Sequence, residues 1–170
     1  MAVTTEANVK KDLANKKITI TRQFDFAPQL VWDAWTKSEI LDRWWAPKPW
    51  KAETKKFEFK VGGMWHYAMV GPKNEKHWGR FDYTKIDMSK SFDGTDAFAD
   101  ENGVKSTDKP ETNWHVEFNK AGKGTELVVY VTATKPDALE KMIEMGFEDG
   151  FKMGLDNLEE YLERKRPELE

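Results

Sequence analysis

Three histidines are the first side chains of this sequence to consider for catalysis or metal binding. His66, His77 and His115 are never two or four residues apart, and no carboxylate joins them at a recognised metal-ligand spacing. The chain has no cysteine, which excludes disulfides, thiolate metal sites and cysteine nucleophiles. The sequence therefore predicts no metal and no cofactor. It leaves enzymatic activity undecided, favours its absence, and retains only His66 as a candidate polar group of a pocket.

Carboxylates inside a cavity are the second route to chemistry, since general acid–base catalysis needs a proton-transferring group close to a bound substrate. Glu58 and Glu117 lie opposite apolar strand positions, where we expect water to solvate them. Asp82 and Asp87 bracket a strand whose inward side the pattern does not define. The sequence singles out none of them as catalytic.

Aromatic and methionine side chains are the better candidates, for binding rather than for catalysis. Tyrosine and tryptophan combine a large apolar ring with a polar tip that orients a bound molecule, and methionine adapts to irregular shapes. An ordinary packed core uses the same residues, so both interpretations stay open. The candidate pocket residues are Trp45, Trp65, Tyr67, Trp78, Tyr83, Trp114, Met142, Met145 and Phe151.

Three glycines, Gly146, Gly150 and Gly154, recur every four residues in the C-terminal third. A glycine inside a helix costs up to about 1 kcal/mol, so three on one stripe indicate a purpose. Close packing against a neighbouring element and room for a ligand both remain open. The flanking acids Glu148 and Asp149 exclude a membrane-spanning GxxxG helix.

These residues need a fold with a core, and the chain is long enough to form one. Its 170 residues are 39% hydrophobic and 34% charged, as in a single soluble globular domain. A net charge of −3 argues against a nucleic-acid partner. No apolar stretch approaches the roughly 18 residues of a membrane span, and the N-terminus lacks the apolar region of a secretory signal. We therefore expect a cytoplasmic protein.

Sequence periodicity places the elements. Alternation predicts a half-buried strand over 18–24, and helical spacing predicts two short helices between Pro28 and Pro47. About six strands joined by short turns then form an antiparallel meander that extends to about residue 131. Asp93-Gly94 and Asn102-Gly103 are two of the predicted turns.

The C-terminal third changes period and predicts one long helix. Apolar residues from Leu139 to Leu162 recur at spacings of three and four, Thr134 is a candidate cap, and the pattern ends before Pro167. Such a helix of about 28 residues is roughly 42 Å long, enough to cross a sheet. We expect an α+β fold in which a curved antiparallel sheet wraps around this helix and leaves a cavity between them.

The domain prediction follows from these elements. Residues 1–16 are polar without periodicity and predict a flexible arm. Residues 17–166 hold all the predicted core and form a single domain. Residues 167–170 are a tail, whose last two residues are typical of a cloning remnant.

Four stretches resemble one known family in order and spacing. They are 24–47 with the Trp44-Trp45 doublet, 57–64 with Gly62-Gly63, 124–127, and 150–162, which begins Gly150-Phe151. Together they resemble the SRPBCC superfamily, the helix-grip fold shared with START lipid-binding domains and the birch pollen allergen. In detail they are similar to the branch related to the C-terminal domain of the activator of the ninety-kilodalton heat-shock chaperone's ATPase. Phe151 departs from this pattern, because many members carry tryptophan there.

The resemblance, over about residues 17–163, implies a helix-grip domain and leaves three functions open. The aromatic and glycine-bearing stretches favour binding of a small hydrophobic or aromatic molecule between sheet and helix, without catalysis. The alternatives are a chaperone-associated interaction module of the stress response and a polyketide cyclase- or aromatase-like enzyme. The sequence does not define the oligomeric state.

Overall fold

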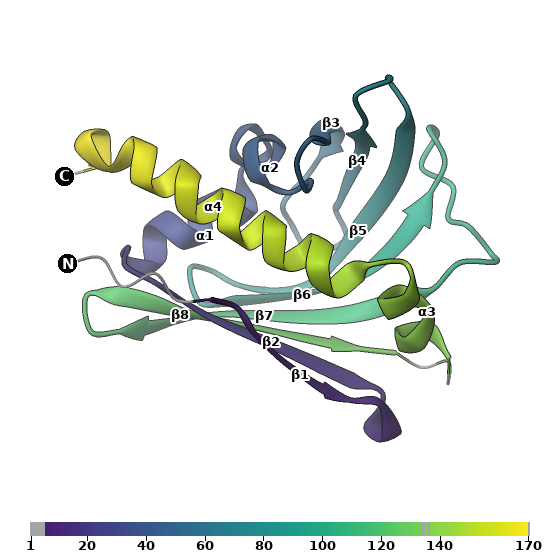
Figure 1. The fold of residues 1–170 in the computed structure, drawn as a ribbon, viewed down its shortest axis with the longest axis horizontal. Coiled ribbons are helices and arrows are strands. Elements are labelled where there is room, and N and C mark those ends of the chain that lie inside the picture. Colours follow the sequence, from purple (N-terminus) through teal and green to yellow (C-terminus); the bar gives the residue numbers. More distant parts are fainter. Residues whose placement is uncertain (1–5, 134, 136, 170) are drawn as a thin grey trace.

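The computed structural model describes residues 6–133, 135 and 137–169. Within these residues an eight-stranded antiparallel sheet, in the order β1-β2-β8-β7-β6-β5-β4-β3, curves around one long helix (Figure 1). This is the predicted α+β helix-grip arrangement. Residues 1–5 of the predicted arm, the candidate cap Thr134 and Glu170 of the predicted tail lie outside the described residues.

The elements follow the sequence order that periodicity predicts. The strands are β1 Asn8–Asp12, β2 Lys17–Phe24, β3 Lys51–Phe57, β4 Met64–Val70, β5 Lys76–Asp87, β6 Ser91–Ala99, β7 Glu111–Ala121 and β8 Gly124–Thr132. The helices are η1 Leu13–Asn15, α1 Pro28–Thr36, α2 Ser38–Trp44, α3 Ala138–Glu144 and α4 Phe147–Leu169.

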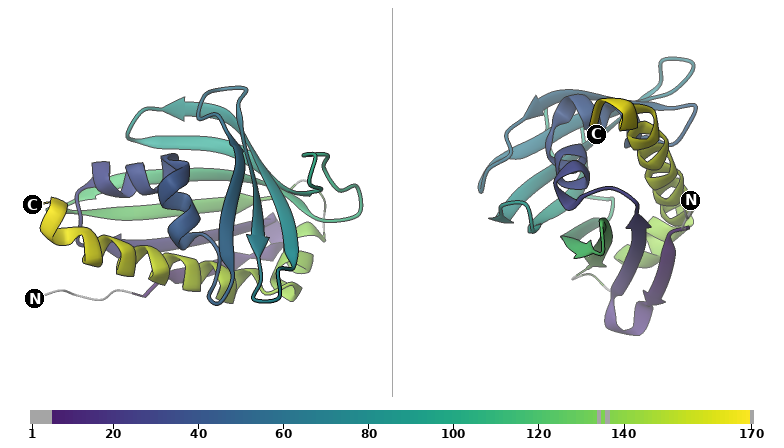
Figure 2. Two further views of the ribbon diagram at one scale, coloured as in Figure 1. Left: turned by 90° about the horizontal axis from the view of Figure 1, so that it is seen from above. Right: turned by 90° about the vertical axis from the view of Figure 1, so that its left-hand side faces the viewer.

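The core lies between the concave face of the sheet and the helices. Helices α1 and α2 cover one part of that face, and α4 crosses it diagonally (Figure 2). Strand alternation explains which side chains of β2 enter this core. Ile18, Ile20 and Phe24 are buried, whereas Gln23 is exposed. Leu155 and Leu158 of α4 are fully buried against them.

Strand β1 differs from the flexible arm that the sequence predicts for residues 1–16. It pairs antiparallel with β2, from Asn8 opposite Thr21 to Asp12 opposite Lys17. Lys11 Nζ also lies 2.7 Å from Glu148 Oε1 on α4. An edge strand can be held by backbone hydrogen bonds alone and need not alternate apolar with polar residues. The polar sequence of β1 therefore lacks the periodicity that would predict a strand.

Strand β6 runs straight through Asp93-Gly94, where the sequence predicts a turn. Gly94 pairs with Tyr83 on one side and with Trp114 on the other. A Cβ atom at this position would overlap the ring of Phe81. The glycine therefore makes room for a neighbouring aromatic ring within a strand. The Asn102-Gly103 turn is as predicted, with Gly103 at φ +85°.

The single C-terminal helix of the prediction is two helices. Gly146 has φ +88°, a left-handed conformation that glycine adopts without strain, and it ends α3 before α4 begins at Phe147. The spacing of three and four continues across the break because both helices turn apolar residues toward the same core. Helix α4 also continues through Pro167, beyond the predicted end.

Helix α4 is fixed where it meets the end of α2. Gly154 lies so close that a Cβ atom there would be 3.2 Å from the Trp45 carbonyl oxygen. The buried Asn157 side chain donates from Nδ2 to the carbonyl oxygens of Ala46, at 3.0 Å, and Trp44, at 3.3 Å. These carbonyls follow the last turn of α2 and have no helical partner of their own. Asn157 therefore satisfies them inside the core.

None of the described helices combines the length and apolar character needed to cross a membrane.

Replacing Asn157 with leucine tests this contact. The variant leaves two buried carbonyl groups without their donor, so we expect the free energy of unfolding to fall by about 2 kcal/mol. Chemical denaturation followed by tryptophan fluorescence measures the change. Arg164→Leu, at an exposed position of the same helix, is the control and should change stability by less than about 0.5 kcal/mol. Equal effects of the two variants would contradict a specific role for Asn157.

Candidate ligand pocket

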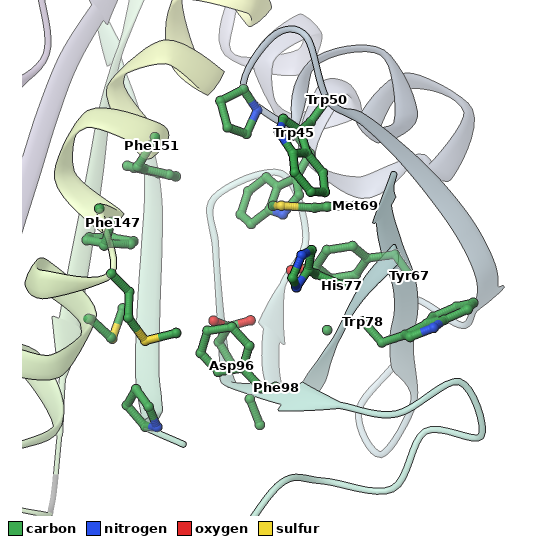
Figure 3. A pocket seen from close by; sticks show the side chains of 18 of the residues that line it. Trp45, Trp50, Tyr67, Met69, His77, Trp78, Asp96, Phe98, Phe147 and Phe151 are labelled. Atoms are coloured by element: carbon green, nitrogen blue, oxygen red, sulfur yellow. The ribbon is translucent and has the colours of Figure 1, made fainter. Parts of the chain in front are cut away.

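A cavity of about 440 Å³ lies between the sheet and the helices beyond the point where α4 is fixed to α2 (Figure 3). Strands β4 to β7 form one wall, the connection from α2 to β3 forms the second, and α3 with the first turns of α4 forms the third. Its lining is mainly aromatic and aliphatic. A cavity of this size and character suits a small organic molecule.

Two glycines give the cavity its shape. A Cβ atom at Gly150 of α4 would meet only Pro47 Cγ, at 3.9 Å, so this glycine leaves volume free. A Cβ atom at Gly79 of β5 would lie 2.8 Å from the Tyr67 hydroxyl oxygen, so this glycine lets the tyrosine lie across the strand. The three helical glycines thus have separate roles: Gly146 ends α3, Gly150 leaves space, and Gly154 permits close packing.

Seven of the nine apolar candidates from the sequence line this cavity. Trp78 is the marginal member, since its indole packs at a tilt against His66 with ring centroids 4.9 Å apart and points away from Phe147 and Phe151 (Figure 3). The lining candidates are Trp45, Tyr67, Trp78, Trp114, Met142, Met145 and Phe151.

The other two candidates, Trp65 and Tyr83, lie deeper than the cavity. Trp65 stacks on Tyr67 with ring centroids 4.0 Å apart, and its indole Nε1 donates to Thr54 Oγ1 at 3.0 Å. Tyr83 packs edge-on against Phe59 at 4.9 Å. Both border only a void of about 10 Å³. They therefore support the wall from behind.

The histidines are dispersed over the sheet. His66 is buried on the convex face, opposite the cavity, where Nε2 lies 2.9 Å from the Asp100 carbonyl oxygen. The sequence offered it as a pocket group, but Trp65 and Tyr67 on either side face the concave side, so alternation directs His66 outward. His115 also faces outward, between Asp93 and Glu117. Only His77 lines the cavity, with its ring 5.2 Å from that of Trp50.

Asp96 is the functional candidate that the sequence analysis missed. It lies on β6 and is the only carboxyl among the described residues that line the cavity (Figure 3). The signal was present as alternation of Phe92, Gly94, Asp96 and Phe98, but the turn predicted at Asp93-Gly94 concealed this strand. His77 is an exposed residue of β5 that also borders the cavity.

The environment of Asp96 disfavours its charge. Desolvation by the surrounding protein, and secondarily the negative charge of Glu111, raises the pKa of Asp96 to about 7. The residue is partly buried, and its carboxyl has no hydrogen-bond or ion-pair partner among the described residues. Burial, and secondarily Asp96 itself, raises the pKa of the Tyr67 hydroxyl well above its ordinary range. Both groups are therefore largely neutral in the empty cavity near pH 6.

A second unsatisfied group lies in the cavity wall. The indole Nε1 of Trp45 is buried and has no hydrogen-bond partner within the part of the chain that is described. It approaches the Tyr67 side chain, whose ring centroid is 6.3 Å from that of Trp45, without reaching hydrogen-bond geometry. Its interaction with the Tyr67 hydroxyl opposes the rise that burial causes in the pKa of Tyr67.

The described histidine and carboxylate side chains do not form a metal site. Over residues 6–133, 135 and 137–169, no three histidine, aspartate or glutamate side chains are grouped so as to hold a metal ion.

A curved antiparallel sheet that holds a long helix over an apolar cavity defines the START-like class of helix-grip domains. The sequence agrees: residues 25–163 match the family described as activator of Hsp90 ATPase homolog 1-like protein. The chain belongs to this AHSA1 family, within the SRPBCC superfamily.

Solved structures of bacterial proteins show the same architecture. A solution structure from Arthrobacter aurescens has a TM-score of 0.87 at 30% identity, covering 92% of this chain and 91% of that one. Protein Ms6760 of Mycobacterium smegmatis has a TM-score of 0.84 at 28% identity, covering 91% and 95%. A solution structure from Staphylococcus epidermidis has a TM-score of 0.81 at 27% identity, covering 93% and 94%. Among curated proteins, none matches this chain.

The raised pKa of Asp96 predicts a pH-dependent cost in stability. Between its ordinary pKa of 3.8 and about 7, the folded protein holds a proton that the unfolded chain has released, so stability falls as the pH rises through this range. Asp96→Asn removes this dependence. We expect the variant to gain stability over the parent by on the order of 1–2 kcal/mol more at about pH 8 than at about pH 5.

Denaturant unfolding at both pH values measures this gain. Asp87→Asn, at an exposed position of β5, controls for the change in net charge. A difference between Asp96→Asn and the parent that is the same at both pH values would contradict the assigned environment.

Proposed function

We propose that the protein binds a small hydrophobic or aromatic molecule in the cavity between the sheet and α4. The apolar cavity of about 440 Å³ carries this proposal. Removing apolar surface from water contributes about 25 cal/mol per Å², so even a two-ring molecule would gain several kcal/mol on entering. We retain the cytoplasm, expected from the sequence, as the compartment of this activity.

The rings around the cavity support an aromatic occupant in particular. Phe147 and Phe151 stack with centroids 5.5 Å apart, and Trp114 stands edge-on to both, at 6.0 and 5.5 Å. Such faces and edges contact a further ring in stacked or edge-on geometry. Met142 and Met145 at the helical wall adapt to its outline.

Filling the cavity from α4 tests the proposal. We expect Gly150→Leu to weaken binding of prodan, a neutral naphthalene dye that brightens in apolar surroundings, by at least about 10-fold. The new side chain enters space that only Pro47 borders, and leucine favours the helix over glycine. Fluorescence titration measures the affinity, and thermal unfolding shows whether the variant remains folded.

Met153→Leu is the matched control, because it places the same side chain at an exposed position of α4. It should leave the affinity unchanged. Equal prodan affinity for parent, Gly150→Leu and Met153→Leu would place the dye outside the cavity and overturn the proposal.

A chaperone-associated module of the stress response is the second candidate, and membership of the AHSA1 family favours it. If it is correct, the protein binds a purified Hsp90-type chaperone at micromolar concentration and changes its rate of ATP hydrolysis. Calorimetry and a steady-state ATPase assay measure both effects. No heat of binding and no change in ATPase rate at high micromolar protein would remove this candidate.

The cyclase-like alternative from the sequence now depends on a different residue. His66 faces away from the cavity, so proton transfer to a bound substrate would fall to Asp96 or His77. Asp96 has a pKa in the range that suits a general acid or base. No observation favours a particular reaction.

A further inference from the structure

We infer that the cavity selects aromatic molecules that carry a basic nitrogen, with the Asp96 carboxylate as the counter-ion of the bound ammonium group. This inference rests on the proposed function and adds the chemical class of the ligand. Three independent features of the cavity support it: the sign of its charges, the unpaired state of Asp96, and the orientation of its rings.

The charges of the lining residues have one sign. No lysine or arginine is among the described residues that line the cavity, and Asp96 is its one carboxyl. A fatty acid or another carboxylate would therefore leave its charge unpaired next to an acid, at a considerable desolvation cost. An ammonium group instead finds a partner, and Coulomb attraction in such an apolar cavity is stronger than in water.

The Asp96 carboxyl has unused hydrogen-bonding capacity. It makes no hydrogen bond or ion pair with any described residue, and because Asp96 is only partly buried, it remains accessible from the cavity. The strand fixes the direction of the Asp96 side chain. Because β6 pairs on both edges, alternation directs positions 96 and 98 to the concave face. The positive charge of a ligand ammonium group would compensate the charge of the ionised Asp96 carboxyl.

The rings complete the site. Trp45, Trp114 and Phe151 lie in mutual contact at ring-centroid distances of 5.5 to 6.1 Å. A cation within about 6 Å of such ring faces gains roughly 0.5–2 kcal/mol from the ring quadrupoles. Tyr67, next to Asp96, adds a hydroxyl oxygen that accepts a hydrogen bond. Carboxylate and ring faces together match an organic ammonium ion.

The pH dependence follows from the groups around Asp96. From β7 it faces Glu111, from β4 Tyr67, and from β5 His77, while α3 and α4 contribute no charged group to the lining. A permanent cation binds the ionised form of Asp96. Its affinity should therefore rise between about pH 6 and pH 8, through the pKa of about 7, and the rise should disappear in Asp96→Asn. A rise that persists in that variant would contradict the role of Asp96.

Three probes that share one ring system test the inference: 1-naphthylmethyltrimethylammonium, 1-naphthylmethanol and 1-naphthylacetate. Calorimetry at about pH 8 gives the affinity of each. We expect the cation to bind the parent at least about 10-fold more tightly than the alcohol and the anion to bind most weakly. Asp96→Asn should remove the advantage of the cation over the alcohol.

The outcomes separate the two proposals. Binding of the alcohol without any advantage for the cation, or a preference for the anion, overturns the inference about the basic nitrogen and leaves the apolar site intact. Binding of none of the three probes overturns both. The comparison of cation, alcohol and anion in the parent protein decides the question even if Asp96→Asn does not fold.

Discussion

The contact between α4 and the end of α2 is the constraint on which the rest of the structure depends. Gly154 brings the helix within van der Waals distance of the Trp45 carbonyl, and Asn157 satisfies the carbonyls of Trp44 and Ala46. Beyond this contact, toward the C-terminus, Leu155, Leu158 and Leu162 close the core completely. Before it, Gly150 leaves space and the helix stands away from the sheet. One fixed point thus divides the concave face into a packed half and a hollow half.

The hollow half carries one acidic side chain, Asp96, on an otherwise mainly apolar lining. Desolvation raises the pKa of this carboxyl, so its ionised form is disfavoured in the folded protein. A cationic group beside it would reduce this cost. Departures of this kind from local rules are expected at functional sites. The cavity and its single carboxyl support the proposed binding of a small molecule.

The fold was predictable because its main signals are periodic. Alternation in β2, the aromatic helix pair before Pro47 and the apolar repeat of α4 each require burial on one side, and together they define a helix-grip sheet. The failures have local causes. Gly94 makes room for Phe81 within a strand, yet beside Asp93 it has the composition of a turn. That error concealed Asp96, and with it the main polar group of the site. His66 shows the opposite case, in which alternation beside Trp65 and Tyr67 already held the answer.

The most direct measurement of the central claim is a two-dimensional ¹H–¹⁵N NMR titration of the eight tryptophan indole groups with 1-naphthylmethanol. Trp45, Trp50 and Trp114 line the cavity and Trp78 lies at its margin, whereas Trp32 and Trp44 are buried elsewhere in the core. The account predicts that the first three signals shift together with one saturable affinity while those of Trp32 and Trp44 move little. Shifts confined to Trp78, whose indole points away from the cavity (Figure 3), or no shifts at millimolar probe, would contradict it.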